Sequence, residues 1–141
     1  METYSKYISS VDPQNAIRKN VTKILIAEDD TAVREFASRA LVNAGHEVIA
    51  AADGLQALEA LENDEFDLLL SDIVMPELDG IALALKVSRG WPDLPILLMT
   101  DYAAERQRAH NLDALIHDVI SKPFTLQQFY DAAEKVLDSR S

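Results

Sequence analysis

The chain has 141 residues, of which 48% are hydrophobic and 26% charged, values typical of one soluble globular domain with a buried core. It contains no cysteine, which excludes a disulfide framework and thiol chemistry and suits a reducing cytoplasm. The net charge of −11 opposes binding to nucleic acid phosphates. No apolar run approaches the roughly 20 residues that span a bilayer, so we expect a cytoplasmic protein that contacts neither nucleic acid nor membrane.

The first 20 residues are polar and show no sustained apolar period, so they predict a flexible or partly helical extension ahead of one domain over residues 21–141. Negative charge is concentrated in that domain. The extension has a net charge of +1, from Lys6, Arg18 and Lys19 against Glu2 and Asp12.

Strand and helix patterns alternate along the first half of the domain. Residues 23–27 are a short apolar run that predicts a strand. Apolar residues then recur at helical spacing from Val33 to Ala44, with Gly45 as a suitable stop. Residues 47–51 predict a second, weaker strand, and a short helix follows Asp53-Gly54.

The same alternation continues to the end of the chain. Residues 66–71 predict a strand, a helix follows Asp79-Gly80, and residues 96–99 predict the next strand. Residues 103–111 are compatible with a helix, and residues 119–121 predict a fifth strand. Thr125 is a suitable N-cap for a last helix, whose inner face is predicted to consist of Leu126, Phe129, Ala133, Val136 and Leu137.

Strands that alternate with helices at this spacing predict a parallel sheet covered by helices on both faces. Five such units with right-handed crossovers suit a flavodoxin-like doubly wound (βα)5 fold of the α/β class, with strand order 2-1-3-4-5.

Polar residues stand where four of the predicted strands end: Glu28-Asp29, Asp72, Thr100 and Lys122. Ligands of open parallel sheets bind at this carboxyl edge. Three carboxylates brought together there repel one another, and a cation or a proton must relieve the repulsion. An all-oxygen ligand set that also serves a phosphoryl group favours Mg²⁺. Capping of the following helix is an alternative role for the acids, but it explains Asp30 and not Asp72.

Asp72 can act as a metal ligand only or also as a nucleophile, because a carboxylate can attack phosphorus to form an acyl phosphate. The hydroxyl of Thr100 and the ammonium of Lys122 would then contact the phosphoryl oxygens and stabilise their charge.

Four segments together resemble the receiver domain of bacterial two-component response regulators: Ile24 to Asp30, Ser71 to Gly80, Thr100 and Ser121 to Phe124. The resemblance covers about Lys23 to Leu137. The chain looks like a stand-alone receiver, most of all like those that control the cell cycle and proteolysis. It implies that the chain is a phosphoacceptor switch and not a conventional enzyme.

The resemblance also implies roles for single residues. Asp72 would accept a phosphoryl group from a histidine kinase or a histidine phosphotransfer protein, and Lys122, followed by a cis peptide bond, would bind the phosphate. Thr100 would be the switch hydroxyl. Mg²⁺ would be held by Glu28, Asp29, Asp72 and the backbone carbonyl of Val74. A downstream protein would contact the fourth helix, fifth strand and last helix, including Arg106, Arg108, His110, Gln127, Tyr130 and Asp131.

The chain departs from the family pattern at several positions. Val119 stands where receivers usually carry an aromatic switch residue, and Asp101 stands where a small residue usually leaves room for the phosphoryl group. Neither Val74 nor Tyr102 can position an attacking water as a carboxamide or carboxylate does, so we expect slow self-dephosphorylation.

Other classes of protein remain as alternatives. Asp101 and Val119 favour a pseudo-receiver, an adaptor that binds partners without phosphorylation, whereas the complete acidic, hydroxyl and lysine set opposes it. A phosphatase with an aspartate nucleophile would need a second acid where Val74 stands. Flavodoxin-type cofactor binding would need a Gly-rich or hydroxyl-rich phosphate-binding loop after the first strand, and the sequence has none there.

Overall fold

The computed structural model describes residues 22–100 and 118–138, and its strands form one parallel sheet in the order β2-β1-β3-β4-β5. This order confirms the predicted fold. The five strands are β1 (Lys23–Ala27), β2 (Glu47–Ala51), β3 (Leu68–Asp72), β4 (Ile96–Thr100) and β5 (Asp118–Ser121).

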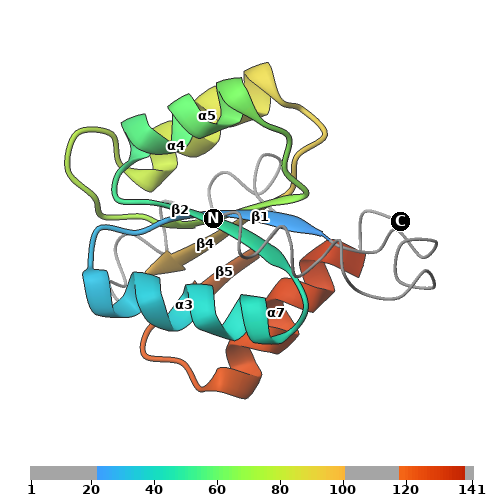
Figure 1. Cartoon of the computed structure of the whole chain (residues 1–141). Coiled ribbons are helices and arrows are strands. Elements are labelled where there is room, and N and C mark those ends of the chain that lie inside the picture. The colour runs from blue at the N-terminus through green and yellow to red at the C-terminus, as the bar shows by residue number, and fades with distance from the viewer. Residues whose placement is uncertain (1–21, 101–117, 139–141) are drawn as a thin grey trace.

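Within the described residues, four helices cover the two faces of the sheet (Figure 1), with α4 and α5 on one face and α3 and α7 on the other. Their bounds are α3 (Thr31–Asn43), α4 (Gly54–Asn63), α5 (Gly80–Gly90) and α7 (Leu126–Asp138). The predicted helix over residues 103–111 lies outside the described residues, as do Asp101, Tyr102, Arg106, Arg108 and His110.

Each helix begins after a side chain that accepts a hydrogen bond from the first turn. The acceptors and their distances to the backbone nitrogen are Asp30 at 3.1 Å, Asp53 at 2.8 Å, Asp79 at 2.9 Å and Thr125 at 3.0 Å. Such a bond satisfies one of the free N–H groups at a helix N-terminus. The capping roles predicted for Asp30 and Thr125 are therefore confirmed.

Two predictions of detail were wrong. Strand β3 begins at Leu68 and includes Asp72, whereas we expected residues 66–71. The cause lies at Asp67, where the carboxylate accepts a hydrogen bond of 2.8 Å from the backbone N–H of Lys23 and so ends the regular ladder. Leu126 is 46% exposed and does not belong to the inner face of α7. It is the first residue of that helix, ahead of the turns that contact the sheet.

The core consists of two apolar clusters, one on each face of the sheet. Alternate residues of β3 enter alternate clusters: Leu69 packs with the α4 and α5 side, and Leu68 and Leu70 with the α3 and α7 side. All five residues of β3 are buried, as expected for a parallel strand covered on both faces. Val119 is buried in the α4 and α5 cluster.

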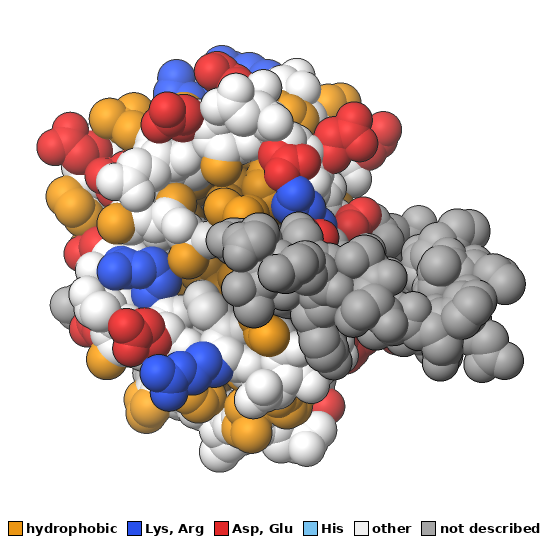
Figure 2. Space-filling model, in the orientation of Figure 1, with side chains coloured by type: hydrophobic (Ala, Val, Ile, Leu, Met, Phe, Trp, Pro, Cys, Tyr) orange, Lys and Arg blue, Asp and Glu red, His pale blue; other side chains and the backbone are white. Residues whose placement is uncertain are grey.

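Within the described ranges, no helix has the length and apolarity that a membrane crossing requires. On the face shown in Figure 2, acidic and basic side chains alternate with apolar ones over both helix layers. The excess of acids is therefore not gathered into one patch on that face.

Candidate functional site at the carboxyl edge of the sheet

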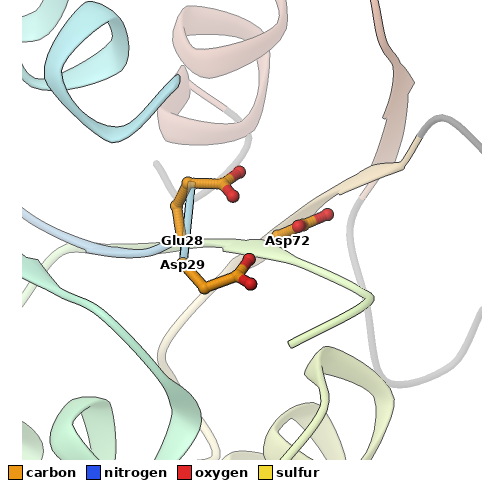
Figure 3. Close-up of side chains that lie close together, drawn as sticks. All are labelled: Glu28, Asp29 and Asp72. Atoms are coloured by element: carbon orange, nitrogen blue, oxygen red, sulfur yellow. The ribbon is translucent and has the colours of Figure 1, made fainter. Parts of the chain in front are cut away.

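Three carboxylates converge where β1 and β3 end. Glu28 and Asp29 directly follow β1, Asp72 is the last residue of β3, and the two strands are neighbours in the sheet. Carboxylate oxygens of all three residues lie within 4.8 Å of one another. Figure 3 shows the three carboxyl groups turned toward a common space. The predicted convergence is confirmed.

Lys122 completes this cluster from β5, two strands away from Asp72. Its Nζ lies 3.0 Å from Oε1 of Glu28 and 3.3 Å from Oδ1 of Asp72. The backbone N–H of Lys122 donates to the carbonyl of Thr100 at 2.8 Å, which joins the ends of β4 and β5. Thr100 is buried at that same end of β4. The sheet therefore brings all four polar strand ends to one place.

Burial gives the cluster its electrostatic character. Glu28 is fully buried and Asp72 is 6% exposed, whereas Asp29 is exposed. Burial, and then the negative charge of Glu28, raise the pKa of Asp72 from 3.8 to about 7 against the opposing effects of Lys122 and of the Ile73 N–H. The site thus disfavours a negative charge on Asp72 unless more positive charge arrives.

The pKa of Lys122 is also raised, but for a lysine this shift favours the charged form. Burial alone would lower the pKa of Lys122, but the hydrogen bond to Glu28 and the charges of Asp72 and Glu28 outweigh it and raise that pKa. The ammonium is therefore charged throughout the physiological pH range.

Glu28 is held in place by its surroundings. Its Oε2 accepts a hydrogen bond of 3.0 Å from the backbone N–H of Asp30, and its other oxygen pairs with Lys122. The guanidinium of Arg34, on the first turns of α3, donates to the Glu28 carbonyl at 2.7 Å. Sequence reasoning missed Arg34, because its only signal is a position six residues after Glu28 on a predicted helix.

Gly80 positions Asp72 from behind, a role that sequence reasoning also missed. A Cβ at Gly80 would stand 2.1 Å from the carbonyl oxygen of Asp72, so only glycine fits there. The Gly80 N–H donates to the carbonyl of Ile73 at 2.7 Å, and Ile73 is fully buried. The start of α5 is thereby packed directly against the end of β3.

An aromatic cluster fixes the chain that follows Lys122. The Lys122–Pro123 peptide bond is cis, as the family resemblance implied. Phe124 then stacks on Phe129 of α7 with ring centroids 5.2 Å apart, and Phe36 of α3 lies 6.1 Å from both rings. Helices from one layer thus anchor the loop that carries the lysine.

The donor set fits a hard divalent cation. Three carboxylates offer oxygen ligands, Asp29 faces solvent, and Mg²⁺ prefers oxygen and retains water in its shell. The negative charge of Glu28 contributes to the raised pKa of Asp72, and a bound cation would oppose that effect. Val74 lies in the loop after β3, and the role of its carbonyl as a ligand stays a prediction.

Comparisons with known proteins agree with this geometry. A family described as "Response regulator receiver domain" matches residues 24–134. The chain is 42% identical over 115 residues to the response regulator receiver protein CpdR of Brucella abortus (strain 2308), covering 82% of this chain and 96% of that protein. It is 40% identical to the response regulator MprA of Mycobacterium ulcerans (strain Agy99), covering 75% of this chain but only 46% of that protein.

Solved structures show the same fold. The crystal structure of a CheY-like receiver domain protein from Methanospirillum hungatei JF-1 superposes with a TM-score of 0.80 at 30% identity, covering 86% of this chain and 97% of that one. The chemotaxis response regulator CheY4 of Vibrio cholerae gives a TM-score of 0.77 at 27% identity, covering 83% and 99%.

Proposed function

Because the chain belongs to the response regulator receiver family, we propose that it is a phosphorylation switch in which Asp72 accepts a phosphoryl group from a histidine kinase or a histidine phosphotransfer protein. One observation carries the proposal. The Asp72 carboxylate has two further carboxylates within 4.8 Å and the ammonium of Lys122 at 3.3 Å. Such a constellation suits phosphoryl transfer, which depends on positioning and on stabilisation of spreading charge.

In the proposed reaction an oxygen of ionised Asp72 attacks phosphorus, the bond from phosphorus to the donor imidazole breaks, and an acyl phosphate forms. Lys122 holds the negative charge of Asp72 before transfer and contacts a phosphoryl oxygen afterwards. Thr100, at the neighbouring strand end, supplies the hydroxyl that senses the new group. The chain thus assists its own modification and turns over no separate substrate.

Glu28, Asp29 and Asp72, with the carbonyl of Val74, would hold Mg²⁺. Bound there, the ion supplies the positive charge that keeps Asp72 ionised and neutralises the phosphoryl oxygens. The exposed Asp29 side chain leaves part of the shell open to water and phosphate.

The phosphodonor protein has to approach Asp72 along the carboxyl edge of the sheet. Beside Lys122 an apolar hollow of about 410 Å³ opens between the start of α3 and Phe124, and Phe36 at its rim is 41% exposed. Such an aromatic at a protein surface suits a partner contact. An Ala32→Tyr variant, which fills the hollow from an exposed position outside the aromatic cluster, should lose phosphorylation by a protein donor while it retains phosphorylation by a small phosphodonor.

The signal would leave through a protein contact that includes α7, where Gln127 and Asp131 are exposed and Tyr130 is half-buried. Gln127 donates a hydrogen bond of 2.8 Å to Asp131, so the two form one polar surface.

The acyl phosphate should hydrolyse slowly. Val74, two residues after Asp72, is aliphatic and 44% exposed, and it cannot hold an attacking water. A time course of phospho-Asp72 decay tests this: a Val74→Asn variant should lose the group faster than the wild type. Equal decay within seconds in both proteins would contradict the proposal.

The decisive test is mass spectrometry after incubation with Mg²⁺ and a small phosphodonor such as acetyl phosphate. A phosphoryl adduct should form on the wild type and be absent from Asp72→Asn. The departures at Asp101 and Val119 favour the second candidate, a pseudo-receiver that binds partners without phosphorylation. Failure to form an adduct, even with a competent phosphotransfer protein, would select that candidate.

A further inference from the structure

An acidic groove of about 760 Å³ lies at the amino edge of the sheet, opposite the Asp72 site. It runs between the C-terminal ends of α4 and α5 and the entries to β3 and β4. Its lining includes the carboxylates of Glu62, Asp64, Glu65 and Asp93, but no Lys or Arg among the residues that the structure describes.

Two helix ends add to the negative potential of this groove. Helices α4 and α5 both point their C-termini at it, and the unpaired carbonyls of a helix C-terminus carry partial negative charge. The last turn of α5 holds Arg89, whereas the last turn of α4 holds no basic residue to offset that charge. The groove is therefore complementary to a cationic ligand.

The groove also offers aromatic surface. Phe66 and Trp91 line it and are half-buried. Two of its lining residues already bind a cation from outside the groove: the ammonium of Lys23 pairs with Asp64 and lies 5.6 Å from the centroid of the Phe66 ring. A cation over an aromatic face is held by charge and by the ring quadrupole together.

The ion pair between Lys23 and Asp64 leaves most of the groove's negative charge uncompensated. Within residues 22–100 and 118–138, no Lys or Arg forms an ion pair with Glu62, Glu65 or Asp93. Three exposed carboxylates and the indole of Trp91 thus line one groove, whose volume is large enough for several side chains.

We propose that this groove binds the chain's own N-terminal segment through Arg18 and Lys19. The described chain begins at Thr22, next to Lys23, whose ammonium pairs with Asp64 of the groove lining. Arg18 and Lys19 precede Thr22 by four and three residues, a reach of about 10–13 Å in extended chain, to which their long side chains add. The segment over residues 1–20 is net positive in a protein of net charge −11.

This contact is independent of the phosphoryl site. Phe66 of the groove precedes the first residue of β3 and Asp72 is the last, so the groove and the phosphoacceptor occupy opposite edges of the sheet. The proposal therefore extends beyond the switch function and does not rest on it.

Trp91 provides the readout, because it is the single tryptophan of the chain. In the full-length protein, Arg18→Glu/Lys19→Glu should release the segment, shift Trp91 emission to the red and raise its acrylamide quenching constant roughly twofold. High salt should do the same to the wild type by screening. The matched control is Arg39→Glu/Lys135→Glu, on α3 and α7 behind the sheet, which changes the net charge equally and should leave Trp91 unaffected.

A charge swap separates contact from general charge effects. Glu65→Lys/Asp93→Lys should expose Trp91 when made alone, and combination with Arg18→Glu/Lys19→Glu should restore its protection. Equal quenching in the wild type and in the Arg18→Glu/Lys19→Glu variant would overturn the proposal, as would failure of the swap to restore protection. Protection of Trp91 only on addition of a synthetic Arg- and Tyr-containing peptide would assign the groove to a partner segment and would likewise overturn it.

Discussion

The two edges of the sheet carry the same kind of residue in opposite environments. At the carboxyl edge, Glu28 and Asp72 are buried and held by Lys122 at 3.0 and 3.3 Å. At the amino edge, Asp64 and Asp93 are exposed. The pKa values of the two sets of acids differ accordingly. Burial and the charge of Glu28 raise the pKa of Asp72 to about 7, whereas Lys23 lowers the pKa of exposed Asp64.

The contrast indicates that acidic residues interact strongly enough to support chemistry when burial keeps water from solvating each carboxylate. Buried charges interact at short range through a weakly screening medium, and exposed ones are screened by water and salt. The carboxyl edge therefore suits a reaction, and the amino edge suits salt-sensitive binding.

The largest expected effect is the change in stability when an Asp is replaced by Asn at the carboxyl edge, compared with the same replacement at the amino edge. In metal-free protein above pH 8, Asp72→Asn should stabilise the fold by up to about 4 kcal/mol, because the pKa rises by about 3 units on folding at about 1.36 kcal/mol each. A raised carboxyl pKa contributes stability at low pH that is lost as the pH rises, here between about 4 and 7. Asp64→Asn should slightly destabilise the protein instead.

Urea unfolding at pH 4.5 and pH 8 measures both variants. The gain from Asp72→Asn should shrink at the lower pH, and saturating Mg²⁺ should stabilise the wild type more than the variant. A gain independent of pH would show that charge repulsion at Asp72 is not its source.

The second largest effect is the loss of stability when a paired lysine is removed, which should be greater at the carboxyl edge than at the amino edge. Lys122→Ala leaves Glu28 and Asp72 without their common cation and should destabilise the fold by about 3 kcal/mol at neutral pH. Lys23→Ala removes a partly exposed pair with Asp64 and should cost less than about 1 kcal/mol. Chemical denaturation measures both, and equal losses would mean that burial does not decide the strength of these pairs.

The two ends of α5 offer a third comparison. Gly80→Ala should destabilise the protein by about 2–3 kcal/mol and slow phosphorylation, because the added methyl group meets the backbone of Asp72 at 2.1 Å. Gly90→Ala is the matched control, since no atom lies within 4 Å of its added methyl, and it should change stability by less than about 1 kcal/mol. Thermal unfolding and adduct formation of both variants measure these effects.

The smallest expected effect concerns metal binding. Asp29→Asn should weaken Mg²⁺ binding about tenfold, because it removes one charged ligand and leaves the core intact. Asp93→Asn, an equal change at the amino edge, should alter the affinity less than about twofold. Titration calorimetry with Mg²⁺ measures both, and a similar loss in the two variants would place the ion elsewhere or show only general attraction to an acidic protein.

Much of the fold was predictable because the relevant signals are local. The apolar run of β1 and the capping residues Asp30 and Thr125 mark their elements without reference to the rest of the chain. The start of β3 was misplaced by two residues, because the turn at Asp67 depends on a hydrogen bond from Lys23, far away in the sequence. Leu126 was misassigned since helical spacing does not reveal which turn contacts the sheet.

In the candidate site, too, some residues could be predicted from the sequence and others could not. Residues at strand ends, such as Asp72 and Lys122, were found because parallel strands place their carboxyl ends together. The contributions of Gly80 and Arg34 were missed, because each acts by contacting a backbone atom and leaves no pattern in the sequence.

By itself the sequence determined the order of the elements, the receiver family and the set of polar side chains at the strand ends, since each depends on residue type and spacing. Only the tertiary structure decided how strongly those side chains act. It buries Glu28, brings Lys122 from β5 across to Asp72, and leaves the acids of the amino edge in water. The physical reason is that charge strength depends on distance and solvation, which are properties of the assembled sheet.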